Sequence, residues 1–146
     1  MATLRLDISP TPAHVRTARL VATTVARQCG VEEGALDEIR LAVGEACSRA
    51  VNLHRELAPH ALVTIWLADD QRFTVTVVDD APVGADVSDV DPIDLIEGTT
   101  GPDGGLDSLP SGFGLAVIDG LVDDLHIEPV ADGGNGTRVT MSWPLV

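Results

Sequence analysis

Apolar residues recur every three or four positions in two regions of the chain, and this spacing predicts two long helices. The first stripe consists of Val15, Ala18, Ala22, Val25 and Cys29. The second stripe consists of Leu36, Ile39, Val43, Ala46, Ala50 and Leu53. Thr11 and Pro12 predict the start of the first helix, and Gly30 predicts its end after about Cys29. The second helix is predicted from about Glu32 to Arg55.

Apolar residues alternate with polar ones elsewhere, which predicts short strands. A first strand precedes the helices, two follow them as a hairpin, and two more form a hairpin near the end: 4–8, 61–68, 73–79, 125–130 and 138–143. The hairpin turns are predicted at 69–72 and 132–136. A third, short helix is predicted near 112–121. Trp66 and Trp143 lie within predicted strands, and both are predicted to be core residues on a face of the sheet.

Residues 81–110 have no clear period and are rich in aspartate, glycine and proline. We expect a long mobile lid loop with one short helical turn near 93–97, because a structureless segment of this length is typically functional or disordered. The element order is then β-α-α-β-β-loop-α-β-β. It predicts a single α+β domain over residues 1–146, a two-layer sandwich. Helices would cover one face of a mixed, mostly antiparallel sheet.

Net charge is the strongest signal in the composition. Of the 146 residues, 23 are acidic and 9 are basic, so the formal net charge is −14, and every basic residue is arginine. Such a surface repels nucleic acid and anionic membranes, so we expect direct binding to neither. It favours a basic protein as partner, and transcription factors often carry basic faces. Simple solubility is the alternative explanation of the charge.

The chain reads as that of a cytoplasmic protein. It has no basic, apolar leader and no run of about 18 apolar residues. Cys29 and Cys47 are the two cysteines, and free thiols in a reducing compartment are favoured over a disulfide. No Cys/His spacing indicates a metal site.

Four short stretches follow one another in an informative order: LAVGEACSRAVNLH from Leu41, VVDDAPVG from Val77, SGFGLAV from Ser111 and GGNGTRV from Gly133. Together, over nearly the whole chain, they resemble the nucleotide-binding module of the anti-sigma serine kinases of the RsbW and SpoIIAB type. That module has the Bergerat fold, shared with histidine kinases, gyrase and a class of heat-shock chaperones (the GHKL ATPases). The resemblance implies the same fold here and a site for ATP and magnesium.

The helix motif of this family is Glu-x-x-x-Asn, in which the glutamate is a general base and the asparagine oxygen holds magnesium. Glu45 matches the glutamate, but Arg49 stands at the asparagine position. Arginine is a permanent cation with donors only and cannot ligate magnesium. We expect it to pair with Glu45 and make that carboxylate a poorer base, which would leave Glu45 vestigial. Without the resemblance, the two are a surface pair worth about 0.3–0.5 kcal/mol.

The next two motifs depart from the family at glycine positions. Asp79 matches an aspartate that accepts the adenine amino proton, but Ala81 and Val83 stand where the family has glycines. The alternative interpretation of Asp79 is an acid that ends a strand. Gly112 and Gly114 match a phosphate cradle at a helix start, where backbone amides bind anions. An ordinary helix N-terminus is the alternative there.

Two further matches are less specific. Gly136 and Thr137 match the family's Gly-Thr before the final strand, although a hairpin turn explains them equally well. Arg19 resembles a family arginine that contacts protein partners, and its alternative is one solvated arginine among nine. The resemblance implies cofactor contacts for Thr137 and a partner contact for Arg19.

The resemblance implies an anti-sigma factor that sequesters an RNA polymerase sigma factor and is antagonised by a STAS-type anti-anti-sigma protein. Family members commonly form homodimers, so a homodimer or heterocomplex is expected. The replaced magnesium ligand and lost glycines favour a protein without kinase activity, bound ATP or magnesium. The alternative is an active ATP-dependent serine kinase that phosphorylates the STAS partner. A third interpretation is nucleotide binding without transfer, with Arg49 contacting a phosphate in place of the metal.

Overall fold

The computed structural model describes residues 3–81, 122, 124–130 and 136–145. The strands are β1 (Thr3–Ile8), β2 (Val63–Asp70), β3 (Arg72–Val78), β4 (Asp124–Pro129) and β5 (Thr137–Pro144). The helices are α1 (Pro12–Cys29) and α2 (Leu36–Leu57), with a short 3₁₀ turn η1 (Glu33–Ala35) before α2. The predicted start of the second helix at Glu32 is therefore four residues early, since the chain first makes this tighter turn.

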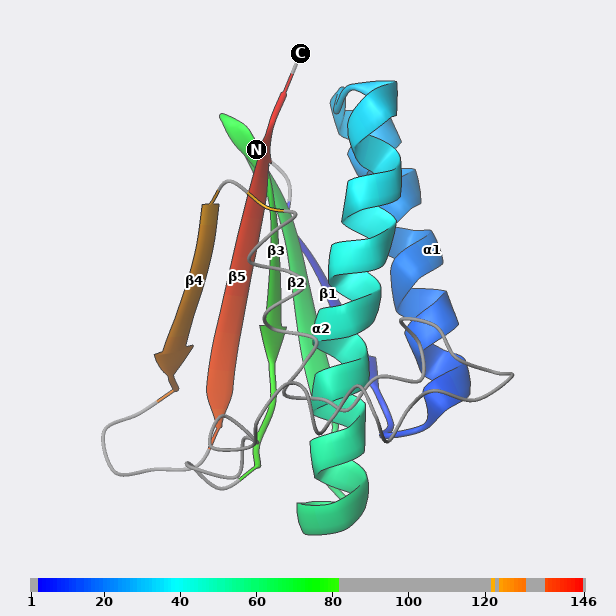
Figure 1. Ribbon diagram of the computed structural model, residues 1–146, viewed down its shortest axis with the longest axis vertical. Coiled ribbons are helices and arrows are strands. Elements are labelled where there is room, and N and C mark those ends of the chain that lie inside the picture. The colour runs from blue at the N-terminus through cyan, green and yellow to red at the C-terminus, as the bar shows by residue number, and fades with distance from the viewer. Residues whose placement is uncertain (1–2, 82–121, 123, 131–135, 146) are drawn as a thin grey trace, which may run out of the picture.

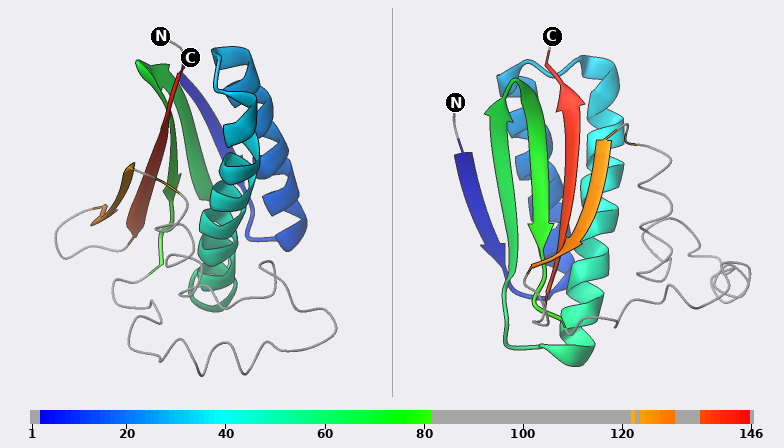
Figure 2. Two further views of the ribbon diagram at one scale, coloured as in Figure 1. Left: turned by 45° about the horizontal axis from the view of Figure 1, so that its top comes forward. Right: turned by 90° about the vertical axis from the view of Figure 1, so that its left-hand side faces the viewer.

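The five strands form one sheet in the order β1-β2-β3-β5-β4. All four pairings between these described strands are antiparallel, so the predicted mixed character is not found among them. α1 and α2 lie side by side on one face of the sheet (Figures 1 and 2). The predicted α+β two-layer architecture, with helices on one face, is confirmed.

The local signals at the helix ends act largely as expected. Pro12 opens α1 after Thr11, whose backbone is extended but whose side chain forms no capping hydrogen bond. Gly30 ends α1 in the left-handed conformation, with φ of 97°, and its N–H caps the carbonyls of Ala26 and Arg27. The chain then turns back, so α2 packs along α1 and both lie over the sheet.

α2 is buried over more than the predicted stripe. All six stripe residues are buried, but so are Gly44, Glu45, Cys47, Arg49 and His54. The helix is enclosed because α1 packs on one side of it and the sheet on another, as Figure 1 shows. A polar residue on α2 can therefore face protein rather than water, which decides the chemistry of the site described below.

The two tryptophans lie on opposite faces of the sheet. Trp143 is 3 % exposed and lies near Phe73, with ring centroids 6.2 Å apart. Trp66 is 38 % exposed, and the Arg5 guanidinium lies 5.3 Å from the centre of its ring. The prediction that Trp66 is a core residue is therefore wrong. On β2 the inward positions are the alternate residues Val63, Ile65 and Leu67.

Several sequence predictions fall outside the described residues. These are the third helix near 112–121, the helical turn near 93–97, and all of the 81–110 loop except Ala81. Cys29 and Cys47 are both free thiols. No helix in the described part of the chain is long and apolar enough to cross a membrane.

Candidate functional site

Arg49 and Asp79 form an ion pair inside the protein. Arg49 lies on α2 and Asp79 follows the end of β3, and the Arg49 Nη1 donates a hydrogen bond of 2.9 Å to the Asp79 Oδ2. Each side chain is only 2 % exposed. Two opposite charges taken out of water require each other, because the desolvation cost of either one alone is several kcal/mol. The pair therefore fixes α2 against the end of β3.

The second carboxylate oxygen of Asp79 is also occupied. Its Oδ1 accepts hydrogen bonds from the backbone N–H groups of Ala81, at 3.1 Å, and Thr137, at 3.2 Å. The Asp79 N–H in turn donates to the Thr137 carbonyl at 3.0 Å. One aspartate thus joins α2, the end of β3 and the start of β5. Donors from the protein itself use both carboxylate oxygens.

Gly136 is required where β5 begins beside Asp79. Its φ is +102°, a conformation that residues with a side chain rarely adopt. A Cβ atom here would lie 2.6 Å from the Asp79 carbonyl oxygen. The Gly136 N–H donates to the Ala81 carbonyl at 2.8 Å. The Gly-Thr motif therefore acts here by close backbone packing around Asp79.

His54 supports the same turn, and the sequence interpretation gave it no role. It is fully buried, and its Nε2 accepts the Asp80 N–H at 2.8 Å. Because a backbone N–H can only donate, Nε2 carries no proton, so Nδ1–H donates to the Ala61 carbonyl at 3.0 Å. His54 thus holds the Asp79–Asp80 turn on α2. Its one sequence signal was a position next to the apolar stripe.

Glu45 lies one helical turn before Arg49 and is 3 % exposed. The interpretation of Glu45 and Arg49 as a surface pair is therefore wrong, since both side chains are buried. Arg49 pairs with Asp79, which lies thirty residues later in the chain. The helical spacing of Glu45 and Arg49 gave no indication of this partner. Cys47, between them in the sequence, is no nucleophile, because burial raises the pKa of its thiol to about 12.

The remaining predicted site residues are Gly112, Gly114 and Arg19. Gly112 and Gly114 lie outside the described residues. Arg19 lies on α1, and its side chain crosses α2 at Gly44, where a Cβ atom would meet the Arg19 Cδ at 2.8 Å. The structure therefore brings Asp79, Thr137 and Arg49 together, with Glu45 one turn away, and places Arg19 elsewhere on the helical layer.

Among the described residues of this site, Arg49 does not fit the role of a magnesium ligand. Magnesium takes oxygen ligands, and Arg49 presents N–H donors at the position where the family has a ligand. Asp79, which matches the family's adenine-binding aspartate, already accepts three hydrogen bonds from the protein, two at Oδ1 and one from Arg49 at Oδ2. Among the described residues, no three His, Cys, Asp or Glu side chains cluster in a way that could hold a metal.

A family model described as the histidine kinase-like ATPase domain matches residues 8–143. The chain belongs to this family. No curated protein matches the sequence significantly. The resemblance to the RsbW and SpoIIAB type, inferred from four motifs, is therefore supported by a match over almost the full chain.

Solved structures share the fold. The RsbU and RsbW domains of Rv1364c from Mycobacterium tuberculosis match with a TM-score of 0.61 at 20 % identity, over 99 % of this chain. This chain spans 33 % of that longer protein. The SiaB–SiaC complex from Pseudomonas aeruginosa matches with a TM-score of 0.59 at 9 % identity, over 96 % of this chain and 89 % of the other. The predicted RsbW-type fold is thereby confirmed.

Proposed function

We propose that the protein is an anti-sigma factor that acts by protein contact and not by phosphoryl transfer. It sequesters an RNA polymerase sigma factor and releases it when a STAS-type anti-anti-sigma protein competes. Its family membership supports this, as does its fold, which it shares with the RsbW domain of Rv1364c and with the SiaB–SiaC complex. The formal net charge of −14 favours a partner with a basic face.

The single observation that carries the choice against a kinase is the buried Arg49–Asp79 ion pair. In the family the residues at these two positions bind magnesium and adenine, and in this protein they bind each other. Phosphoryl transfer needs the metal, a free general base and a phosphate cradle together. Removing one partner of a buried pair costs about 3–5 kcal/mol, so a nucleotide would have to displace a strong internal interaction.

The alternative function is a serine kinase that phosphorylates the STAS partner. Glu45 favours it, because it matches the family's general base and is held inside the fold. Incubation with a STAS partner and γ-labelled ATP separates the two functions. We expect no label on the partner. Transfer that depends on Glu45 would establish the kinase, and nucleotide binding without transfer would select the third interpretation.

Affinity capture from the native cell tests the partners directly. We expect the wild-type protein to retain a sigma factor and a STAS protein. Arg49→Ala should retain both at a temperature where it stays folded, because Arg49 lies inside the protein. Arg19→Ala should weaken capture, since we propose a partner contact for this residue. Recovery of neither partner class by the wild type would contradict the proposed function.

The acidic surface gives the association rate a testable salt dependence. We expect binding to the sigma factor to slow as ionic strength rises, because screening shortens the reach of the attraction between opposite charges. Stopped-flow measurement at several salt concentrations gives the slope. An on-rate independent of salt would contradict the electrostatic part of the proposal.

A further inference from the structure

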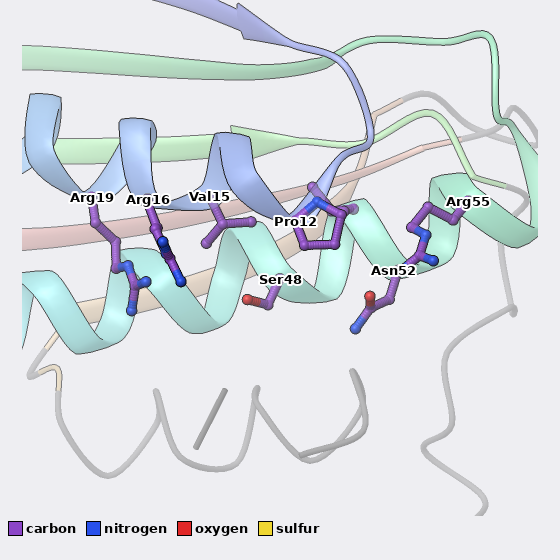
Figure 3. Close-up of a pocket in the computed structure, with 8 residues that line it drawn as sticks. Pro12, Val15, Arg16, Arg19, Ser48, Asn52 and Arg55 are labelled. Carbon is purple, nitrogen blue, oxygen red and sulfur yellow. The ribbon is translucent and has the colours of Figure 1, made fainter. Parts of the chain in front are cut away.

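A hollow of about 290 Å³ lies between α1 and α2, apart from the Arg49–Asp79 pair. Its polar lining comes from Arg16 and Arg19 on α1 and from Ser48, Asn52 and Arg55 on α2. Figure 3 shows Arg16 and Arg19 extending from α1 toward α2, where Ser48 and Asn52 project. The volume is many times that needed for one water molecule, so it can admit a polyatomic group.

The charge of this hollow is opposite to that of the protein. Three of the nine arginines line it, and none of its lining residues is acidic, although the formal net charge is −14. Arg16 and Arg55 are exposed, and within the part of the chain that the structure describes neither forms an ion pair. Neither guanidinium group is therefore committed to a carboxylate of the described residues.

A glycine on α2 makes room for the Arg19 side chain, which extends from α1. Gly44 lies in the interior of this helix, where glycine is less favourable than alanine. A Cβ atom at this position would meet the Arg19 Cδ at 2.8 Å and its Cγ at 3.4 Å. The glycine thus leaves room for the arginine stem to lie across α2, which brings Arg19 to the same hollow as Arg16.

We propose that this hollow is a binding site for a phosphate monoester. Such a group carries a charge of about −1.5 to −2 and three strong acceptor oxygens. Guanidinium groups match phosphate oxygens with paired N–H donors, and the Ser48 hydroxyl and Asn52 amide add neutral donors. A single carboxylate would leave part of this donor set without an acceptor. The inference needs no partner identity, so it stands or fails independently of the proposed function.

Two sources could supply this chemistry, a phosphorylated protein side chain and a small phosphate compound. NMR titration of the ¹⁵N-labelled protein, following the arginine Nε–Hε signals, compares inorganic phosphate with a short phosphoserine peptide. We expect saturable binding of at least one probe, with a Kd below about 1 mM. The same peptide with glutamate in place of phosphoserine should bind at least about tenfold more weakly, because it has fewer acceptors and less charge.

Matched variants show whether the hollow is the site. Arg16→Gln and Arg55→Gln should each weaken phosphate binding about tenfold, as expected for the loss of one charge-assisted hydrogen bond. Gly44→Ala should also weaken it, without any change of charge, by displacing Arg19. Arg27→Gln is the control, because Arg27 lies on the same helix but outside the hollow.

Binding that falls equally in Arg27→Gln and in Arg16→Gln would overturn the proposal, since it would reflect net charge alone. Titration shifts that never saturate with either phosphate probe would also overturn it. The exposed positions of Arg16 and Arg55 make both variants suitable, because surface substitutions change stability little.

Discussion

Arginine has opposite roles in two regions that share α2. Toward the sheet, Arg49 is buried and paired with Asp79 at 2.9 Å. Toward α1, Arg16 and Arg55 are exposed around an open hollow. The difference is a carboxylate already held in place by two backbone N–H groups. Arg49 is therefore held by a carboxylate inside the protein, whereas Arg16 and Arg55 form no ion pair with another described residue.

Asp79→Ala should have the largest effect on stability. It leaves the Arg49 charge buried without its carboxylate and takes the acceptor from the N–H groups of Ala81 and Thr137. We expect a loss of about 3–5 kcal/mol in the free energy of unfolding, measured by urea denaturation. Asp80→Ala is the matched control, because Asp80 is the next residue and is exposed. Equal losses in both variants would contradict the role given to the ion pair.

Arg49→Met should cost slightly less, because it leaves an unpaired carboxylate that keeps its two backbone donors. We expect a loss of about 3 kcal/mol, against about 0.5 kcal/mol or less for Arg55→Met on the same helix. The double variant Arg49→Met/Asp79→Ala should lose about 0.5–3 kcal/mol less than the sum of the two single losses. Additive losses would mean that the two charges do not interact.

Gly136→Ala tests the close backbone approach beside Asp79. Its φ of +102° and the 2.6 Å approach of a Cβ atom to the Asp79 carbonyl oxygen predict a loss of about 1–3 kcal/mol. Gly34→Ala is the control, since a Cβ atom there meets only the Glu32 Oε1 at 3.9 Å. Urea denaturation of both variants gives the comparison. A Gly136→Ala protein as stable as Gly34→Ala would show that the turn relaxes freely.

The smallest expected effect is the acid sensitivity of an exposed carboxylate far from both regions. A hydrogen bond from the Ser142 hydroxyl lowers the pKa of Asp124 from its ordinary value of 3.8. Its contribution to stability is therefore complete above pH 3.8 and is lost as the pH falls from there through the lowered pKa. Asp124→Asn should flatten this part of the curve of unfolding midpoint against pH relative to the wild-type protein. Identical curves would contradict the assignment.

Much of the fold could be predicted from the sequence, because local signals determine it. The 3.6-residue spacing indicated both helices, and Gly30 marked the end of α1 at its observed position. Trp66 was assigned to the wrong face of its strand, because Ile65 and Leu67, which flank it on β2, are the inward residues. Which face of a strand is inward is set by the strand's period, and an aromatic residue does not override it.

The site itself was only partly predictable. Motif matching named both Arg49 and Asp79. It assigned Asp79 to adenine, while helical spacing offered Glu45 as the partner of Arg49. The observed pair joins residues thirty positions apart, which local patterns cannot reveal. The available signal was that Arg49 and Asp79, which carry opposite charges, match two positions of the same family site. The signal for His54 was weaker, because its hydrogen bonds are to backbone groups that come near only in the folded chain.

Calorimetric titration with Mg-ATP tests most directly whether this protein has closed its nucleotide site. The Arg16→Gln/Arg55→Gln variant is the suitable sample, because both substitutions weaken any phosphate binding in the hollow. The account predicts no saturable heat, with Arg49 and Asp79 still bound to each other. One-to-one binding that requires magnesium and is lost in Asp79→Asn would contradict it.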